Sequence, residues 1–111
     1  MTSMRIVAVN TVEIDPAIGS MATLREGLEA LLDDLGHLSG CTAYRLTCGS
    51  DPGESWILTG YWDSPERMTA HFNLPCLARL FELVSERLIS GLRFGTFLVS
   101  PLIESSGETA R

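Results

Sequence analysis

Residues 56–77 read WILTGYWDSPERMTAHFNLPCL, and this stretch decides the fold because it joins a strand to a helix. Its opening run is rich in aromatic and aliphatic residues, which predicts a strand. Asp63 or Ser64 then offers an N-cap oxygen, and Pro65 suits the first turn of a helix. The sequence therefore predicts a strand that leads directly into a capped helix.

The helical part of this stretch carries a histidine on its inner face. Met68, His71 and Phe72 follow one another at spacings of three and four residues, so they share one side of a helix. The helical pattern extends over about 65–90, but Pro75 removes a backbone donor inside it. We therefore predict a helix that is broken or kinked before Pro75.

Hydrophobic spacing elsewhere in the chain predicts the remaining elements. They are a strand over 5–14, a helix over 21–38, strands over 41–48 and 55–62, and a last strand over 92–102 that follows a helix stop at Gly91. The order β-α-β-β-α-β predicts an α+β, ferredoxin-like domain, with a four-stranded antiparallel sheet and two helices on one face. We expect residues 1–103 to form this domain and residues 104–111 to form a flexible C-terminal tail.

The sheet face turned away from the helices is expected to be apolar. In the first strand Asn10 shares the inner face with hydrophobic neighbours, whereas Val7 and Val9 point to the other side. The last strand adds one of its two alternating sets to this face, including Phe94, Phe97 or Val99. A face with this much hydrophobic surface is costly to leave in water, and a second copy of the chain would cover it. We therefore predict a homodimer.

Composition excludes several classes of partner. The chain has 111 residues, 45% hydrophobic and 20% charged, with a net charge of −6. Its eight basic residues are scattered arginines, which is a poor surface for nucleic acid or an anionic membrane. No apolar run is long enough to span a membrane and no secretory signal is recognisable, so we expect a cytoplasmic protein. Three cysteines without C-x-x-C spacing predict reduced thiols and no metal site.

Short motifs along the chain resemble those of the antibiotic biosynthesis monooxygenase family, in the dimeric α+β barrel superfamily. The motifs are SGCTAYRL at 39–46, SDP at 50–52, WIL at 56–58, WDSPE at 62–66 and His71, and the resemblance extends from about residue 4 to residue 99. It implies a homodimer whose sheets form a barrel, with a mainly apolar pocket between sheet and helices. Characterised relatives include cofactor-free oxygenases of anthrones and quinols, haem-degrading enzymes, and isomerases or cyclases.

Three positions depart from the patterns of this family. Where members often carry a second histidine after His71, this chain has Cys76. Haem-degrading relatives use an asparagine that Asn10 matches, but their axial histidine falls near Phe81, so we do not expect haem degradation. The sequence also has no Gly-rich phosphate loop and no paired metal ligands, so we expect no cofactor. Gly60 stands where many members carry a carboxylate, which predicts extra room on that face of the strand.

Cofactor-free oxygenation needs a base, a donor for the developing oxyanion and a dry pocket. His71 is the candidate base, and Asn10 is the candidate oxyanion donor. Arg45 is an alternative ligand for a phenolic oxygen, but strand parity places it opposite its neighbour Tyr44. The candidate residues for binding an aromatic substrate are Tyr44, Trp56, Tyr61, Phe72 and Phe81.

Structural interpretations of the same residues remain open. His71 would then be a half-buried histidine bonded to a backbone carbonyl. Asn10 would satisfy the hydrogen bonds of a neighbouring strand or of a buried water. Trp62 and Cys76 would serve only in packing. The first hypothesis is a cofactor-independent monooxygenase of a small electron-rich aromatic such as a quinol, an anthrone or a polyketide-like metabolite, or a related isomerase or cyclase. The second is a non-catalytic small-molecule-binding or accessory dimer. They differ in whether His71 and Asn10 point into one cavity with space for a planar ligand.

Overall fold

The structure, a computed structural model, describes residues 5–19, 21–51, 53–73 and 75–99. The elements, in chain order, are β1 (Ala8–Pro16), α1 (Met21–Leu35), β2 (Cys41–Thr47), β3 (Trp56–Trp62), α2 (Pro65–His71), α3 (Pro75–Ser85) and β4 (Ile89–Leu98). The expected tail at 104–111 lies outside the described residues. In the part of the chain that the structure describes, no helix is long and apolar enough to cross a membrane.

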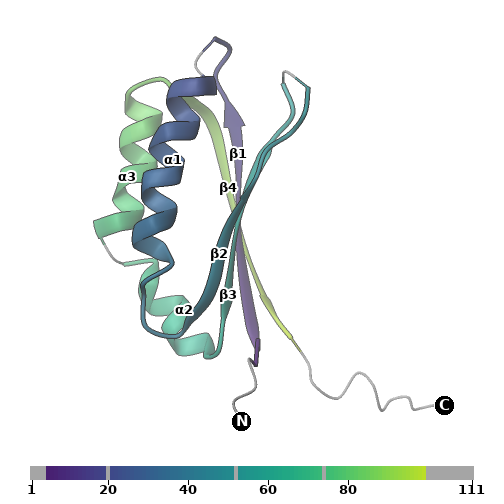
Figure 1. The fold of residues 1–111 in the computed structure, drawn as a ribbon, viewed down its shortest axis with the longest axis vertical. Helices are drawn as coiled ribbons and strands as arrows, with labels where there is room; N and C mark the ends of the chain where they lie inside the picture. Colours follow the sequence, from purple (N-terminus) through teal and green to yellow (C-terminus); the bar gives the residue numbers. More distant parts are fainter. Residues whose placement is uncertain (1–4, 20, 52, 74, 100–111) are drawn as a thin grey trace, which may run out of the picture.

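The four strands form one antiparallel sheet in the order β2-β3-β1-β4. Figure 1 shows α1 and α3 side by side on one face of this sheet, with α2 near one end and the opposite face uncovered. This is the predicted α+β, ferredoxin-like arrangement. The core lies between the sheet and the helices, where leucines of α1 and α3 meet the inner faces of β1 and β3.

Alternate residues of the two central strands face the core, as predicted. In β1 the buried side chains include Asn10 and Val12, and each is flanked by half-buried residues on the open face. In β3 the buried positions are Trp56, Leu58, Gly60 and Trp62. Because the period of a strand is two, this alternation fixes which side chains can meet the helices.

The helical region breaks before Pro75 as predicted, but it ends earlier than Gly91. The chain leaves α3 through Arg87, which has a φ of 65°. The Arg87 N–H donates to the Val84 carbonyl and the Leu88 N–H to the Leu83 carbonyl, both at 3.0 Å. These two bonds are the pattern of a Schellman ending, in which glycine is the usual left-handed residue. An arginine in that position gives no sequence signal, which is why the helix end was misplaced.

Candidate functional site

Three strands and α2 bring four ring or amide side chains together inside the core. Asn10 of β1 and Tyr44 of β2 both pair with Gly60 of β3, so the three residues form a row across the sheet. Trp62 lies one inward-facing position further along β3, and His71 ends α2 above them. Asn10, Trp62 and His71 are at most 1% exposed, and Tyr44 is also buried.

A chain of hydrogen bonds connects these side chains in a single direction. The Trp62 indole Nε1 donates to Asn10 Oδ1 at 2.7 Å, and Asn10 Nδ2 donates to the Tyr44 hydroxyl at 2.8 Å. The Tyr44 hydroxyl lies 3.3 Å from His71 Nε2, and His71 Nδ1 bonds the Met68 carbonyl. An indole N–H only donates and a carbonyl only accepts. His71 Nδ1 therefore carries the proton, and Nε2 accepts from Tyr44.

His71 is a neutral imidazole enclosed by aromatic rings. Burial lowers the pKa of His71, and the bond to the Met68 carbonyl opposes this only in part. Its ring centroid lies 4.5 Å from that of Trp62 and 4.4 Å from that of Phe72. The open interpretation of His71 as a histidine bonded to a backbone carbonyl is therefore confirmed in its geometry. The imidazole also keeps a basic nitrogen, Nε2, whose contact to the Tyr44 hydroxyl is longer than the two bonds of the Asn10 amide.

His71 also forms part of the wall of a cavity of about 250 Å³. The residues that line it come from the loop after α1, from the end of β3 and from α2. They are Leu38, Ser39, Trp62, Arg67, Ala70 and His71. Asn10 does not line this cavity. The Tyr44 hydroxyl lies between His71 and Asn10 and is within hydrogen-bond distance of both. Only one of the two predicted catalytic side chains therefore reaches the cavity.

The predicted substrate-binding residues lie in different parts of the fold. Phe72 packs beside His71, as described. Trp56 is buried at the opposite end of β3, roughly 20 Å along the strand from Trp62 at the usual rise per residue. Phe81 is exposed on α3, where its ring stacks on Phe94 with centroids 6.3 Å apart.

Tyr61 lies on the open face of the sheet, where it lines a hollow of about 390 Å³ together with Arg45. Strand parity thus separates Arg45 from the buried Tyr44, as predicted.

Gly60 does not leave the extra room that was expected. A Cβ built on Gly60 would lie 2.3 Å from Asn10 Oδ1, 2.6 Å from Tyr44 Cε2 and 2.8 Å from Trp62 Nε1. The space above the glycine is filled by the side chains that bond across it. Gly60 is therefore the position that allows Asn10 and Tyr44 to meet over the central strand.

Sequence reasoning missed two contributions to the site. Trp62 was assigned only to packing, although its indole N–H starts the hydrogen-bond chain. Arg67 was not considered, although it lies four residues before His71 and thus on the same face of α2. Its guanidinium Nη1 donates to the Ser39 hydroxyl at 2.9 Å at the edge of the cavity. Helical spacing was the signal that would have revealed Arg67.

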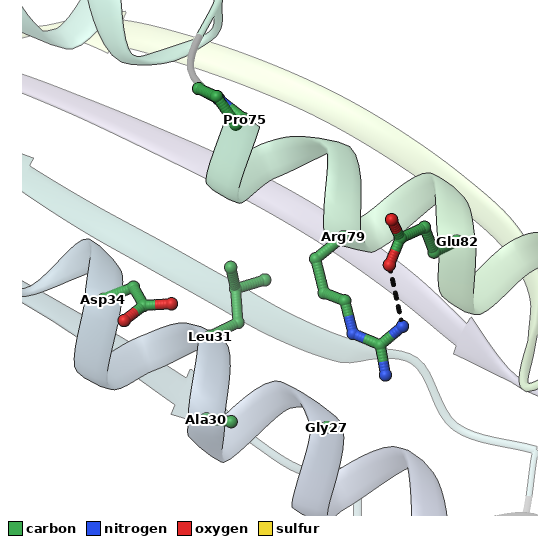
Figure 2. Close-up of a pocket in the computed structure, with 7 residues that line it drawn as sticks. All are labelled: Gly27, Ala30, Leu31, Asp34, Pro75, Arg79 and Glu82. Carbon is green, nitrogen blue, oxygen red and sulfur yellow. Dashed lines mark hydrogen bonds and ion pairs between the residues drawn. The ribbon is translucent and has the colours of Figure 1, made fainter.

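A second cavity, of about 470 Å³, lies between α1 and α3 and shares no lining residue with the first (Figure 2). Its arginine, Arg79, is turned toward Glu82, and its guanidinium is 3.0 Å from that carboxylate and 3.3 Å from Glu86. This cation is already neutralised, so the groove offers no unpaired positive charge to an anionic ligand.

The cysteines show no sign of a catalytic or metal-binding role in the part of the chain that the structure describes. Cys41 and Cys48 are free thiols, and burial raises the pKa of Cys41. Among the described residues no three histidine, cysteine or acidic side chains gather as metal ligands would. The side chain of Cys76 lies outside the described part.

Solved structures of other proteins share this fold. A proposed antibiotic biosynthesis monooxygenase from Deinococcus radiodurans is 21% identical, with a TM-score of 0.72 over 84% of this chain and 92% of the other. The protein PA3566 from Pseudomonas aeruginosa is 19% identical, with a TM-score of 0.71 over 89% and 99%. Rv0793 from Mycobacterium tuberculosis is 19% identical, with a TM-score of 0.70 over 84% and 94%. At these identities the likeness establishes the fold.

No protein of curated function matches the chain. The sequence profile described as "Antibiotic biosynthesis monooxygenase" matches residues 5–83, which is well over half of the chain. The match contains β1, Gly60, His71 and the cavity beside His71. This chain belongs to the antibiotic biosynthesis monooxygenase family.

Proposed function

We propose that this protein is a cofactor-independent monooxygenase of a small electron-rich aromatic metabolite, with His71 as the base. The observation that carries the proposal is the state of His71. A neutral imidazole, held in one tautomer by the Met68 carbonyl, lies in the wall of a cavity in a member of a monooxygenase family. A base that is unprotonated near neutral pH is what proton removal from a phenol or an activated C–H group requires.

The proposed reaction begins with proton transfer to His71 Nε2. The Tyr44 hydroxyl is 3.3 Å from this nitrogen, so a substrate O–H that takes its place must supply the same donor to Nε2. The resulting substrate anion supplies four electrons to O₂; one oxygen atom stays in the product and the other leaves as water. All the reducing equivalents come from the substrate, so the reaction requires neither flavin nor metal. After the transfer, Tyr44 can accept a hydrogen bond from the protonated Nε2.

Asn10 has a different role from the one expected. Both ends of its amide are used, since Oδ1 accepts from Trp62 and Nδ2 donates to Tyr44. An amide with these partners cannot also bind a substrate oxyanion without breaking a buried bond. We therefore assign Asn10 to positioning the Tyr44 hydroxyl beside His71.

The cavity favours a small substrate. Its volume of about 250 Å³ lies below the range of roughly 300–1,000 Å³ that is typical of pockets for drug-sized ligands. A quinol with one or two rings fits this volume better than an anthrone with three.

We also propose that the chain acts as a cytoplasmic homodimer. The open face of the sheet carries half-buried Val9, Ile57 and Tyr61, and Phe97, which pairs with Val9, is 57% exposed. A second copy would remove this hydrophobic surface from water.

A non-catalytic binding dimer is the second candidate, and one observation favours it. Asn10, Tyr44, Trp62 and His71 satisfy one another's hydrogen bonds, as a purely structural network would. An isomerase or cyclase would use the same base without consuming oxygen.

Oxygen uptake distinguishes these candidates. Purified protein, stripped of metal with a chelator and without added flavin, is mixed with a panel of benzene and naphthalene hydroquinones and with an anthrone. We expect uptake above the autoxidation rate, and we expect His71→Ala to lower turnover ~10²–10⁴-fold, the usual contribution of one general base.

His37→Ala is the matched control, because the chain's other histidine is exposed at the end of α1. Binding without oxygen uptake across the panel would support the non-catalytic dimer, or the isomerase if the product differs from the substrate. Uptake that survives in His71→Ala would rule out His71 as the base.

A further inference from the structure

The cavity beside His71 combines an apolar interior with a cation at its edge. Leu38 and Ala70 contribute aliphatic carbon. Trp62, which also borders the cavity, is fully buried, and the only polar atom of its indole is bonded to Asn10 inside the core. A flat hydrophobic ring would be the natural occupant of such walls.

Arg67 supplies the charge at this edge, and it has no carboxylate partner among the described residues. Its guanidinium Nη1 donates to the neutral Ser39 hydroxyl. The two acidic neighbours in sequence do not pair with it: the carboxylate of Glu66 accepts from the Ser64 hydroxyl instead, and no ion pair joins Asp63 to Arg67. A guanidinium has five N–H donors, so most of them remain for a ligand.

Two other arginines that line cavities are held by carboxylates, whereas Arg45, beside the hollow on the open face, forms no ion pair among the described residues. Arg79, in the groove of Figure 2, is held by Glu82 and Glu86. Arg93 lines a hollow on the sheet and is held by Glu13 and Asp15. Among Arg67, Arg79 and Arg93, only Arg67, which shares a cavity with His71, is without an acidic partner in the described part of the chain.

The position of Arg67 is built into the local backbone. Ser64 caps α2 by accepting from the Arg67 N–H at 3.2 Å, which fixes the first turn. Gly40 has a φ of +86°, and a Cβ there would lie 2.4 Å from Arg67 Cδ. The glycine thus lets the loop after α1 pack against the stem of Arg67, and this contact brings Ser39 to its guanidinium.

We propose that this cavity binds an aromatic ring that carries an anionic oxygen group, with the ring on Leu38 and Ala70 beside His71 and the anion on Arg67 and the Ser39 hydroxyl. A carboxylate suits the planar guanidinium best, because it can accept two parallel N–H bonds. The inference rests on the proposed function and narrows its substrate class to hydroquinones that bear a carboxylate, such as dihydroxybenzoates.

Binding under nitrogen tests this proposal without turnover. Isothermal titration calorimetry compares a dihydroxybenzoate with the hydroquinone that lacks the carboxylate. We expect wild type to bind the acid about 10- to 100-fold more tightly, the effect of a hydrogen bond to a charged group. Arg67→Gln should abolish this preference, and Arg67→Lys should restore part of it. Ligand binding should also shift the Trp62 indole N–H resonance.

Arg45→Gln is the control, since Arg45 is an exposed arginine beside the separate hollow on the open face. Equal affinity for acid and neutral ligand, a preference that persists in Arg67→Gln, or no binding of either ligand would overturn the inference. A bound acid that consumes no oxygen would leave the inference standing and contradict the monooxygenase. Oxidation of neutral quinols without any preference for the acid would contradict the inference and support the monooxygenase.

Discussion

Asn10, Tyr44, Trp62 and His71 are polar or partly polar side chains inside a hydrophobic core, and their mutual bonds explain how the fold tolerates them. An unpaired buried donor or acceptor costs ~1–3 kcal/mol. Here the donor-only indole and an acceptor-only backbone carbonyl stand at the two ends of one chain of bonds. That arrangement determines the amide orientation of Asn10 and the tautomer of His71 together.

The pH dependence of His71 follows from its burial. Burial lowers its pKa below the ordinary histidine value of about 6.5, whereas the unfolded chain titrates near that value. Below 6.5 the unfolded state therefore binds protons that the native imidazole does not. The stability associated with His71 is fully present above pH 6.5 and is lost as the pH falls through the folded pKa.

We expect the ¹H–¹⁵N resonances of the His71 ring to titrate below pH 6.5 and, at higher pH, to show the tautomer with the proton on Nδ1. On a confirmed substrate, kcat/KM should be constant around neutral pH and decline on the acid side with the same midpoint. In His71→Gln the acid-side loss of unfolding free energy should become shallower. A His71 midpoint above 6.5 would contradict this account.

The row Asn10–Gly60–Tyr44 shows how three strands act together. Asn10 and Tyr44 come from strands that are not neighbours, and their side chains meet only because the strand between them carries no side chain at the crossing point. Because Gly60 has no side chain, the space above it is available for a hydrogen bond between side chains of β1 and β2.

Gly60→Ala should therefore lower the free energy of unfolding by ~1–3 kcal/mol, the usual cost of adding a methyl group to a filled space. The variant should also shift the Trp62 indole N–H resonance, because Asn10 must move. Thr59→Ala, on the open face of the same strand, is the control. Urea denaturation measures both variants, and a loss in Gly60→Ala no larger than that in Thr59→Ala would show that the row can relax.

The α2 segment has only seven residues, yet it carries Arg67 and His71 at the cavity. A helix this short is not stable by its own propensity. The Ser64 cap at one end and the ring contacts of His71 at the other hold it in place. The break before Pro75 then allows α3 to take a separate course along the sheet (Figure 1).

At the scale of the whole molecule, the open face of the sheet determines the expected assembly. Phe97 on this face and Phe81 on α3 have the same exposed fraction, 57%, but lie on opposite sides of the sheet. They form a matched pair for testing which surface is covered by a second copy.

Static light scattering at micromolar concentration should give twice the chain mass of 12.1 kDa for the wild type. Phe97→Ser should shift the protein toward the monomer because it removes hydrophobic surface from the proposed interface. Phe81→Ser should leave the mass unchanged. A wild-type monomer at every concentration would exclude the dimer, and dissociation by Phe81→Ser alone would place the interface on the helical side.

The sequence by itself determined the order of the elements, the break before Pro75 and the inward side of β1 and β3, because these depend on local spacing and on backbone chemistry. It also placed His71 on the inner face of α2. The sequence did not predict the end of α3, since Arg87 adopts a left-handed backbone conformation that residues with a side chain rarely adopt.

Only the tertiary structure decided what the buried polar groups do. Asn10 is 34 residues from Tyr44 and 52 from Trp62 in the chain. Their contacts depend on strand order and register, which local patterns do not encode. The same holds for Arg67 and Ser39, which are 28 residues apart and meet where the loop after α1 packs on α2. Long-range packing, which joins segments that are distant in the sequence, therefore gave both ends of the Asn10 amide buried partners.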